Sequence, residues 1–133
     1  MYRTAFRETP IVKTNAKIAE RVKYFINCFL ATKVSFSNEF KQMCDAIDVD
    51  YDKVVEYALY DKRLGESHWS VPGPDGDVGF GGSCFPKDIN AIINFGAQKG
   101  IDMKVLRGAW GKNVEVRPAR DWEKLKGRAV TDD

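Results

Sequence analysis

The residues best suited to chemistry lie in one short segment, GFGGSCFPKD, which spans residues 79–88. Its only sulfur belongs to Cys84, and an ionised thiol is a strong nucleophile. Asp88 follows four residues later, so the two side chains face the same site if a helix begins at Cys84. A carboxylate in that position can hold a water molecule for hydrolysis. The glycines of the segment are typical of a turn, a phosphate-binding loop or a backbone that closely approaches a ligand.

A second candidate pair lies earlier in the chain, where Lys23 and Asn27 are also four residues apart. On a helix they share a stripe with Ala16, Leu30 and Val34, whose small or apolar side chains predict that protein covers it. Ionising a thiol near neutral pH takes roughly 2 kcal/mol, and a helix N-terminus supplies only about 0.3–1 kcal/mol. An ammonium about 5 Å away supplies roughly 3 kcal/mol at an effective dielectric constant of about 20. Lys23 is therefore the candidate for activating the thiol and stabilising an oxyanion, with Asn27 as a further ligand.

One long helix is predicted to carry this second pair. Apolar residues recur at helical spacing from Asn15 onward, and no proline or glycine interrupts the stretch. Thr14 and Asn15 are candidate N-caps, so the prediction is a helix over about 15–47. Such a length is unusual in a small domain and favours packing against a second copy of the chain. The apolar positions are Ile18, Val22, Phe25, Phe29, Phe36, Phe40, Met43 and Ile47.

The remaining elements follow from capping residues, glycines and prolines. Asp50 is a candidate N-cap, and Pro86 suits the first turn of a helix. The predicted helices cover about 51–60, 86–100 and 103–116, an irregular loop covers 65–82, and a short turn begins at Asp121. No alternating strand pattern is present, so the predicted fold is all-α, a helical bundle built on one long N-terminal helix.

Length and composition indicate a single globular domain. The 133 residues are 44% hydrophobic and 30% charged, which excludes bulk disorder. The sequence lacks both a membrane span of roughly 18 apolar residues and a signal-peptide pattern, so a cytoplasmic location without membrane contact is expected. The three cysteines show no C-x-x-C spacing, which argues against a metal site. The net charge of +2 forms no single basic face, which argues against a nucleic-acid partner.

The two motif segments together resemble a known family. GFGGSCFPKD and VKYFINCFLATKVSFSNEF are similar to motifs in the central helical domain of the UDP-glucose/GDP-mannose dehydrogenase family. The resemblance implies a domain over 14–117, flanked by a basic arm over 1–13 and a tail over 118–133. It also implies an enzyme that oxidises the C6 alcohol of UDP-glucose twice with NAD, through an aldehyde, a thiohemiacetal and a thioester that water releases as UDP-glucuronate.

The same resemblance implies a catalytic role for four residues. Cys84 is expected to be the nucleophile, and Lys23 is expected to stabilise the oxyanion. Asn27 would bind the water and the oxyanion, and Asp88 would activate the water. The substrate-binding residues expected in this way are Gly79, Phe80, Gly81, Gly82, Arg63 and Lys87.

Two of these expectations concern how the substrate and the cofactor are reached. The glycines would bring the backbone close to the sugar nucleotide, and Arg63, in DKRLG, is similar to an arginine that reaches the substrate of a partner subunit. The run G-x-G-x-x-C at 79–84 follows no predicted strand and is not a dinucleotide fingerprint. NAD is therefore expected to be bound mainly by a domain that this sequence does not contain.

Three interpretations remain open. The leading one is the catalytic-cysteine core of such an enzyme, dimeric through its long helix, with NAD bound by another domain or a separate chain. The second is a helical dimerisation module that retains the motif without chemistry. The third keeps the chemistry but acts on GDP-mannose or a UDP-aminosugar, although Phe85 favours UDP-glucose. In all three, Cys28 and Cys44 are expected to be buried thiols, and His68 is expected to be structural or solvent-facing.

Overall fold

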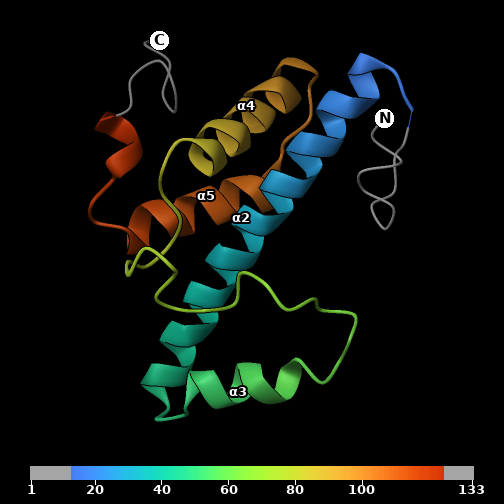
Figure 1. Ribbon diagram of the computed structural model, residues 1–133. Coiled ribbons are helices and arrows are strands. Elements are labelled where there is room, and N and C mark those ends of the chain that lie inside the picture. Colours follow the sequence, from blue (N-terminus) through green and yellow to red (C-terminus); the bar gives the residue numbers. More distant parts are fainter. Residues whose placement is uncertain (1–12, 125–133) are drawn as a thin grey trace.

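The computed structural model describes residues 13–124, which fold as a bundle of helices (Figure 1). The basic arm predicted for 1–13 lies almost entirely outside the described residues, as does the end of the predicted tail beyond residue 124. The elements are α2 (Ala16–Ala46), α3 (Tyr51–Ala58), α4 (Cys84–Gln98), α5 (Lys104–Val116) and the 3-10 helix η1 (Asp121–Lys124). No strand occurs among residues 13–124, so the predicted all-α fold with its long N-terminal helix is confirmed.

The helices begin where local capping signals place them. The Asn15 side chain accepts a hydrogen bond from the Ile18 N–H at 3.0 Å, and α2 begins at the next residue after Asn15. Asp50 accepts from two N–H groups in the first turn of α3. Between these two helices, Asp48 turns the chain with a φ of 56°, in the left-handed region that ends many helices. Side-chain capping therefore confirms the predicted starts of α2 and α3, whereas α4 and α5 begin without a side-chain cap.

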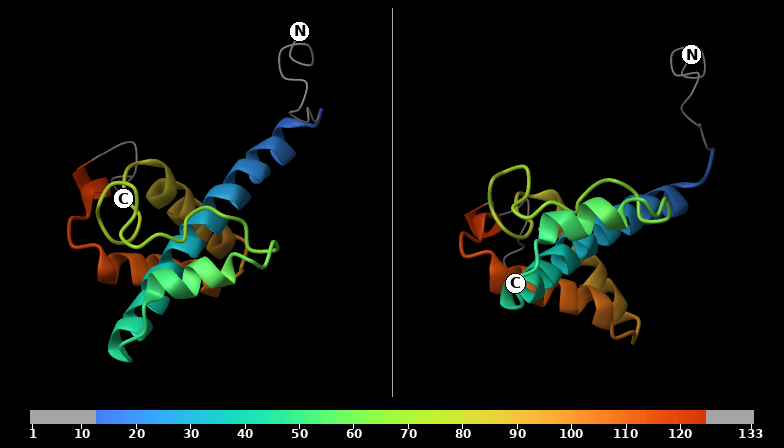
Figure 2. Two further views of the ribbon diagram at one scale, coloured as in Figure 1. Left: turned by 60° about the horizontal axis from the view of Figure 1, so that its bottom comes forward. Right: turned by 90° about the horizontal axis from the view of Figure 1, so that it is seen from below.

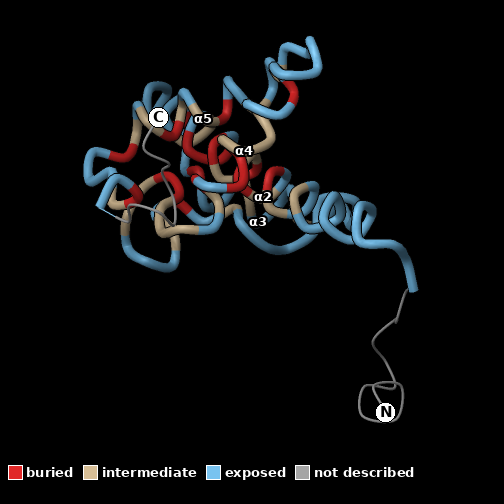
Figure 3. The backbone as a smooth tube through the Cα atoms, turned by 90° about the horizontal axis from the view of Figure 1, so that it is seen from above, coloured by how far each residue is buried: buried red, intermediate tan, exposed pale blue. Residues whose placement is uncertain are grey.

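Helix α2 is the axis on which the other helices pack. Helices α4 and α5 pack against it and against each other, and α3 packs near its C-terminal end. The N-terminal part of α2 extends beyond the other helices (Figure 2), and the backbone is coloured as exposed throughout that part (Figure 3). The helix therefore has a covered part, which meets α4 and α5, and an uncovered part that begins the chain.

Two apolar clusters form the core, and the long loop between α3 and α4 contributes to both. The first cluster lies where α2, α4 and α5 meet, and its buried members are Cys28, Ala31, Phe80, Ile89 and Ala109. The second lies near the start of α3, and its buried members are Cys44, Tyr51 and Val71. Because Val71 and Phe80 belong to the loop, the predicted irregular segment is anchored in the core at two points.

The apolar stripe of α2 takes little part in this core. Phe25 is 77% exposed and Phe29 is 56% exposed, and most of the other stripe residues are exposed as well. The buried positions of α2 are instead small or polar, and they are Cys28, Ala31, Lys33, Ser35, Ser37, Asn38 and Cys44. An apolar surface of this kind on a monomer usually marks an interaction site. No helix among residues 13–124 has both the length and the apolar character needed to cross a bilayer.

Side chains from three elements hold the glycine loop, residues 79–82. Asn38 of α2 accepts from the Gly79 N–H at 3.1 Å, and Asn113 of α5 accepts from the Phe80 N–H at 2.7 Å and donates to the Phe80 carbonyl at 2.8 Å. Asp121 of η1 accepts from the Gly82 N–H at 2.8 Å. The loop that leads into α4 is therefore fixed by hydrogen bonds to residues far away in the sequence.

Two loop glycines provide a test of this packing. Gly79 and Gly76 both have positive φ angles, 70° and 78°, but a Cβ at Gly79 would clash with the Asn113 amide, whereas a Cβ at Gly76 would meet nothing within 4 Å. Gly76→Ala should cost about 1 kcal/mol of the free energy of unfolding, from the backbone alone. Gly79→Ala should cost about 1–3 kcal/mol more, because the Asn113 amide must move. Urea unfolding of both variants measures the difference, and equal losses would contradict the packing described here.

Candidate active site

Cys84 is the first residue of α4, and its side chain is exposed. This start confirms the condition under which Cys84 and Asp88 face one site, since the two residues lie one turn apart at the beginning of the helix. The N-terminus of a helix also presents unbonded N–H groups that favour a nearby negative charge. The Ser83 Oγ lies 3.9 Å from the Cys84 Sγ.

Asp88 is fully buried, and one hydrogen bond ties it to α2. The Asn27 amide donates to Asp88 Oδ2 at 2.6 Å. The second carboxylate oxygen, Oδ1, has no hydrogen-bond partner and lies 3.9 Å from the Lys87 ammonium, which is too long for a hydrogen bond. The structure thus joins two of the four expected catalytic residues and leaves one buried oxygen free to accept a hydrogen bond.

Lys23 does not lie in the covered environment that the sequence predicts. It is exposed, because the described residues of α2 near its N-terminus extend past α4 and α5. Its ammonium lies 5.9 Å from the Tyr24 ring, and no ion pair or hydrogen bond joins it to Cys84 or Asp88. The prediction that this stripe of α2 is covered is therefore wrong for the single chain around Lys23, although Asn27 on the same stripe is partly buried.

The other two thiols are buried, as predicted. Burial, followed by the nearby charge of Asp88, raises the pKa of the Cys28 thiol to about 11. The Cys28 thiol also faces the Asp88 backbone carbonyl at 3.8 Å. Cys44 lies in the second core cluster. Of the three cysteines, Cys84 alone is accessible to a reagent or a substrate.

A cavity of about 760 Å³ lies beside the glycine loop. Gly81 and Phe85, on either side of Cys84 in the sequence, contribute to its wall together with Gly79 and Phe80. The rest of the wall comes from α2 and the long loop, and consists of Val34, Glu66, Ser67, His68, Ser70, Pro72, Gly73, Pro74 and Asp75. This volume falls in the range of small-molecule binding sites.

Contacts within the protein explain the loop glycines without close approach of a substrate. The N–H groups of Gly79, Phe80 and Gly82 already donate to protein side chains, so they are not free to bind a phosphate. A Cβ at Gly81 would clash with the carboxylate of Asp121 and the guanidinium of Arg117. The Phe80 ring is buried in the first core cluster and lies 6.1 Å from the Trp110 ring. Phe80 is thus a core residue as well as part of the cavity wall.

Arg63 and Lys87 are both outside the cavity wall. Arg63 is exposed and forms a two-pronged hydrogen bond with Asp61, which holds the pKa of that carboxyl below its usual range. Lys87 is exposed on the first turn of α4. His68 is exposed, as predicted, and lies 5.8 Å from the Phe85 ring. Within the described part of the chain, no hydrogen bond joins Arg63, Lys87 or His68 to Cys84.

Sequence analysis missed two buried cations beside the site. Lys33 of α2 lies 4.3 Å from the centre of the Trp69 ring and donates to the Leu64 carbonyl at 3.2 Å. Arg117, at the end of α5, is 4% exposed and binds the glycine loop. The only available signal was the spacing of Asn113 and Arg117, which are four residues apart, with Arg117 directly after the predicted helix over 103–116. Residues at that spacing share a face where a helix extends over both.

The described residues do not form a metal or dinucleotide site. Among residues 13–124, no three His, Cys, Asp or Glu side chains gather as metal ligands would. No strand precedes the run at 79–84 in this part of the chain, so a dinucleotide-binding turn between a strand and a helix is not formed there. Cys84, Asp88 and Asn27 are therefore the candidate groups for chemistry within the described part of the chain.

A double-mutant cycle tests the bond between Asn27 and Asp88. Asn27→Ala should cost about 3 kcal/mol of unfolding free energy, because a buried carboxylate then loses its hydrogen-bond donor. The double variant Asn27→Ala/Asp88→Ala should cost about 1–3 kcal/mol less than the sum of the single variants. Asn90→Ala is the control, since its half-buried amide bonds only to the Pro86 carbonyl within α4. Strict additivity in chemical denaturation would show that the two side chains do not interact.

Comparison with known proteins assigns this arrangement to a family. The sequence model for the UDP-glucose/GDP-mannose dehydrogenase family, central domain, matches residues 17–115. The UDP-glucose 6-dehydrogenase of Pseudomonas aeruginosa is 44% identical over 107 residues, which are 80% of this chain and 21% of that protein. UDP-glucose 6-dehydrogenase TuaD of Bacillus subtilis is 36% identical over 108 residues, 81% of this chain and 22% of the relative. The chain thus spans between a fifth and a quarter of these relatives.

A solved structure gives the same result. A UDP-glucose dehydrogenase from the hyperthermophilic archaeon Pyrobaculum islandicum superposes with a TM-score of 0.72 at 34% sequence identity. The superposition covers 86% of this chain and 26% of the archaeal protein. Both comparisons point to the helical centre of these enzymes. The chain belongs to the UDP-glucose/GDP-mannose dehydrogenase family, of which it carries the central domain.

Proposed function

We propose that this chain supplies the thiol site of a UDP-glucose 6-dehydrogenase. The observation that carries the proposal is the placement of Cys84, the one exposed thiol, at the start of α4. Cys84 does not itself line the cavity, but its sequence neighbours Gly81 and Phe85 do. A buried carboxylate lies one helical turn further along the same helix. The relatives with this domain are named as UDP-glucose 6-dehydrogenases.

The proposed chemistry on this chain begins at the Cys84 sulfur. The thiolate adds to the C6 aldehyde of the sugar, the carbonyl π electrons move to oxygen, and protonation of that oxygen gives a thiohemiacetal. Transfer of a hydride from C6 to NAD⁺ bound outside these residues, with loss of the hydroxyl proton, would give a thioester. Water then attacks the thioester carbon and the C–S bond breaks, which releases a carboxylate, a proton and the free thiol. Only this last step frees the sulfur for another turnover.

Asp88 and Asn27 are proposed to hold the hydrolytic water. Asn27 donates to one oxygen of the carboxylate, which leaves the other oxygen, Oδ1, without a hydrogen-bond partner. A buried carboxylate oxygen in that state is a strong acceptor for a water O–H. Lys23, one turn before Asn27, is proposed to stabilise the oxyanion on the substrate. Its exposure in the single chain means that substrate or a second subunit must complete this contact.

The two hydride transfers are assigned to no residue of this chain. An NAD site of the usual kind needs a glycine-rich turn between a strand and a helix, and residues 13–124 contain no strand. We therefore propose that NAD is held by a different domain or chain. The residues described here hold the carbon atom that is oxidised, and they do not fit the cofactor itself.

The cavity wall does not itself supply the cations that the diphosphate of UDP-glucose needs. Glu66 and Asp75 line the cavity, and none of the lining residues is a lysine or an arginine. Two phosphates need cations nearby, so these must come from outside the cavity wall. Arg63 is exposed, and the hydrogen bonds of its side chain within the described residues go to Asp61 alone. We propose that Arg63 of a second copy reaches the substrate.

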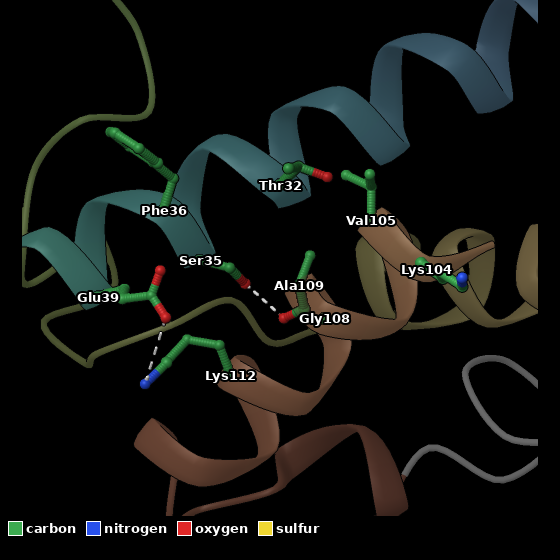
Figure 4. A pocket seen from close by; sticks show the side chains of 9 residues that line it. All are labelled: Thr32, Ser35, Phe36, Glu39, Lys104, Val105, Gly108, Ala109 and Lys112. Atoms are coloured by element: carbon green, nitrogen blue, oxygen red, sulfur yellow. Dashed lines mark hydrogen bonds and ion pairs between the residues drawn. The ribbon is translucent and has the colours of Figure 1, made fainter.

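The apolar stripe of α2 is proposed to be the dimer interface. Its residues repeat at steps of three and four, which is the pattern of helices that pack along their length. Two hollows continue this surface between α2 and α5. One has a volume of about 470 Å³ and is lined mainly by apolar residues such as Phe25, Phe29 and Val105. The other, of about 280 Å³, lies beside Phe36 and the Glu39–Lys112 ion pair (Figure 4). A second copy of α2 would cover both.

Selective alkylation tests the proposed function. Iodoacetamide should modify Cys84 at neutral pH, while Cys28 and Cys44 react only after unfolding, because both are buried and the pKa of Cys28 is raised to about 11. UDP-glucose at about ten times its dissociation constant should slow modification of Cys84 about tenfold. GDP-mannose and UDP-N-acetylglucosamine should protect less. Peptide mass spectrometry identifies the modified thiol.

The control for this experiment is Cys84→Ser, which should remove the fast reaction and leave the other two thiols unmodified. Equal labelling of the three thiols would contradict the assignment of Cys84 as the nucleophile. Fast labelling of Cys84 with no protection by any of the three nucleotide sugars would favour the dimerisation module without chemistry. Stronger protection by GDP-mannose than by UDP-glucose would identify GDP-mannose as the substrate.

Two matched aromatic substitutions test the dimer. Phe29 lies on the α2 stripe and is 56% exposed, whereas Tyr57 lies on α3 and is 60% exposed. Phe29→Glu should raise the dissociation constant of the dimer at least about 100-fold, because each interface would bury a charge in place of an aromatic ring. Tyr57→Glu should leave it unchanged. Sedimentation velocity over a concentration series measures both, and an unchanged dimer in Phe29→Glu would place the interface elsewhere.

A further inference from the structure

The guanidinium of Arg117 connects the C-terminal segment to the loop that leads to Cys84. Its Nε donates to Asp121 Oδ1 at 2.9 Å, and its Nη2 donates to Asp75 Oδ2 at 2.8 Å. Its Nη1 donates to the carbonyls of Val78, at 3.2 Å, and Gly79, at 3.5 Å. All three nitrogens are therefore used, and all but one of the acceptors lie in the segment 75–79.

Asp121 completes the connection from the opposite side of the loop. While one of its oxygens accepts from Arg117, the other accepts from the Gly82 N–H at 2.8 Å. Gly82 lies two residues before Cys84. Burial opposes ionisation of Asp121, but the Gly82 N–H and the Arg117 guanidinium outweigh it and hold the pKa of that carboxyl below its usual range. The carboxylate thus stays charged at neutral pH.

Arg117 and Asp121 together form a clamp on the glycine loop, and neighbouring residues restrict the movement of this clamp. A Cβ at Gly81 would clash with both Asp121 and Arg117, so the loop passes directly against the ion pair. Trp122, the next residue after Asp121, is buried against the Trp110 ring of α5 at 5.2 Å. The clamp is therefore anchored in the bundle, and a displacement of the clamp would be passed on to the loop.

The ion pair of Arg117 with Asp75 links the clamp to the cavity. Asp75 lines the cavity and also binds Arg117, which pairs with Asp121 and so reaches Gly82. A continuous series of contacts therefore runs from Asp75 in the cavity wall, through Arg117 and Asp121, to Gly82, which lies two residues before Cys84. The matched surface pair, Arg107 and Asp102, has no such continuation into a loop or a cavity.

We propose that Arg117 and Asp121 are positioning residues, which hold residues 79–82 so that Cys84 and the cavity wall keep their relative places. The inference rests on the proposed function only for the identity of the ligand, UDP-glucose. The effect of Arg117 and Asp121 on the mobility of residues 79–82 does not depend on that ligand. The C-terminal segment 117–124 is by this inference a part of the active site.

The test compares Asp121→Ala with Asp121→Asn and with the control Asp102→Ala. Hydrogen exchange of the amides at 79–84 should quicken about tenfold in Asp121→Ala, while α2 around Cys28 keeps its protection. Asp121→Asn retains an acceptor for the Gly82 N–H, so its exchange rate at 79–84 should lie between those of the parent and Asp121→Ala. Arg117→Lys keeps the charge but loses the fork of donors, and it should also quicken exchange at 79–84. Asp102→Ala should match the parent.

A second readout separates positioning from simple destabilisation. In Asp121→Ala, UDP-glucose should no longer slow alkylation of Cys84, while Cys28 and Cys44 stay unmodified because the core is intact. Parent-like exchange at 79–84, or an equal rise of exchange throughout α2, would overturn the inference. If Asp121→Ala does not fold, Asp121→Asn and Arg117→Lys decide by the same two measurements. Absence of UDP-glucose protection in the parent would instead overturn the proposed function, and the exchange result would stand.

Discussion

A single buried carboxylate constrains how α4 lies on α2. Asp88 has no contact with solvent, and its only hydrogen-bond donor is the Asn27 amide. A buried charge without a partner costs several kcal/mol, so sliding or rotating α4 by one residue is strongly disfavoured. Cys84 lies one turn before Asp88 on the same helix, and its position follows from this constraint. The Cys84 thiol is therefore positioned by a hydrogen bond in the core, while the thiol itself is exposed.

The helices could be predicted from the sequence because their signals are local. Asn15 and Asp50 cap the helices that follow them, and the predicted helix over 15–47 is observed at Ala16–Ala46. Pro86 falls in the first turn of α4, as its missing N–H requires. The motif residues were found in the same way, by spacing within one segment. Each of these inferences needs only the residues within one or two helical turns.

The contacts that assemble the site could not be predicted, because they join residues far apart in the sequence. Asn38 and Asp121 bind amides of the glycine loop that are 41 and 39 residues away. Periodicity showed which side of α2 is apolar, but it did not show which side α4 and α5 would cover. The exposure of Lys23 has the same origin, since covering that stripe requires protein beyond the described part of one chain. Glycines drew attention to this loop, although packing against Asn113 and Arg117 explains two of them.

The two faces of helix α2 differ in residue type and in exposure. The face toward α4, α5 and the long loop carries small and polar residues. Ser35 donates to the Ala109 carbonyl of α5 (Figure 4), and Asn38 accepts from the Gly79 N–H of the glycine loop. Such hydrogen bonds fix geometry more than they add stability, since each contributes only about 1 kcal/mol net. The opposite face carries large apolar residues that remain in solvent in the single chain. The single chain therefore leaves Phe25, Phe29 and Phe36 largely in solvent, and a protein surface that covered them would add the hydrophobic stabilisation that α2 does not gain within the bundle.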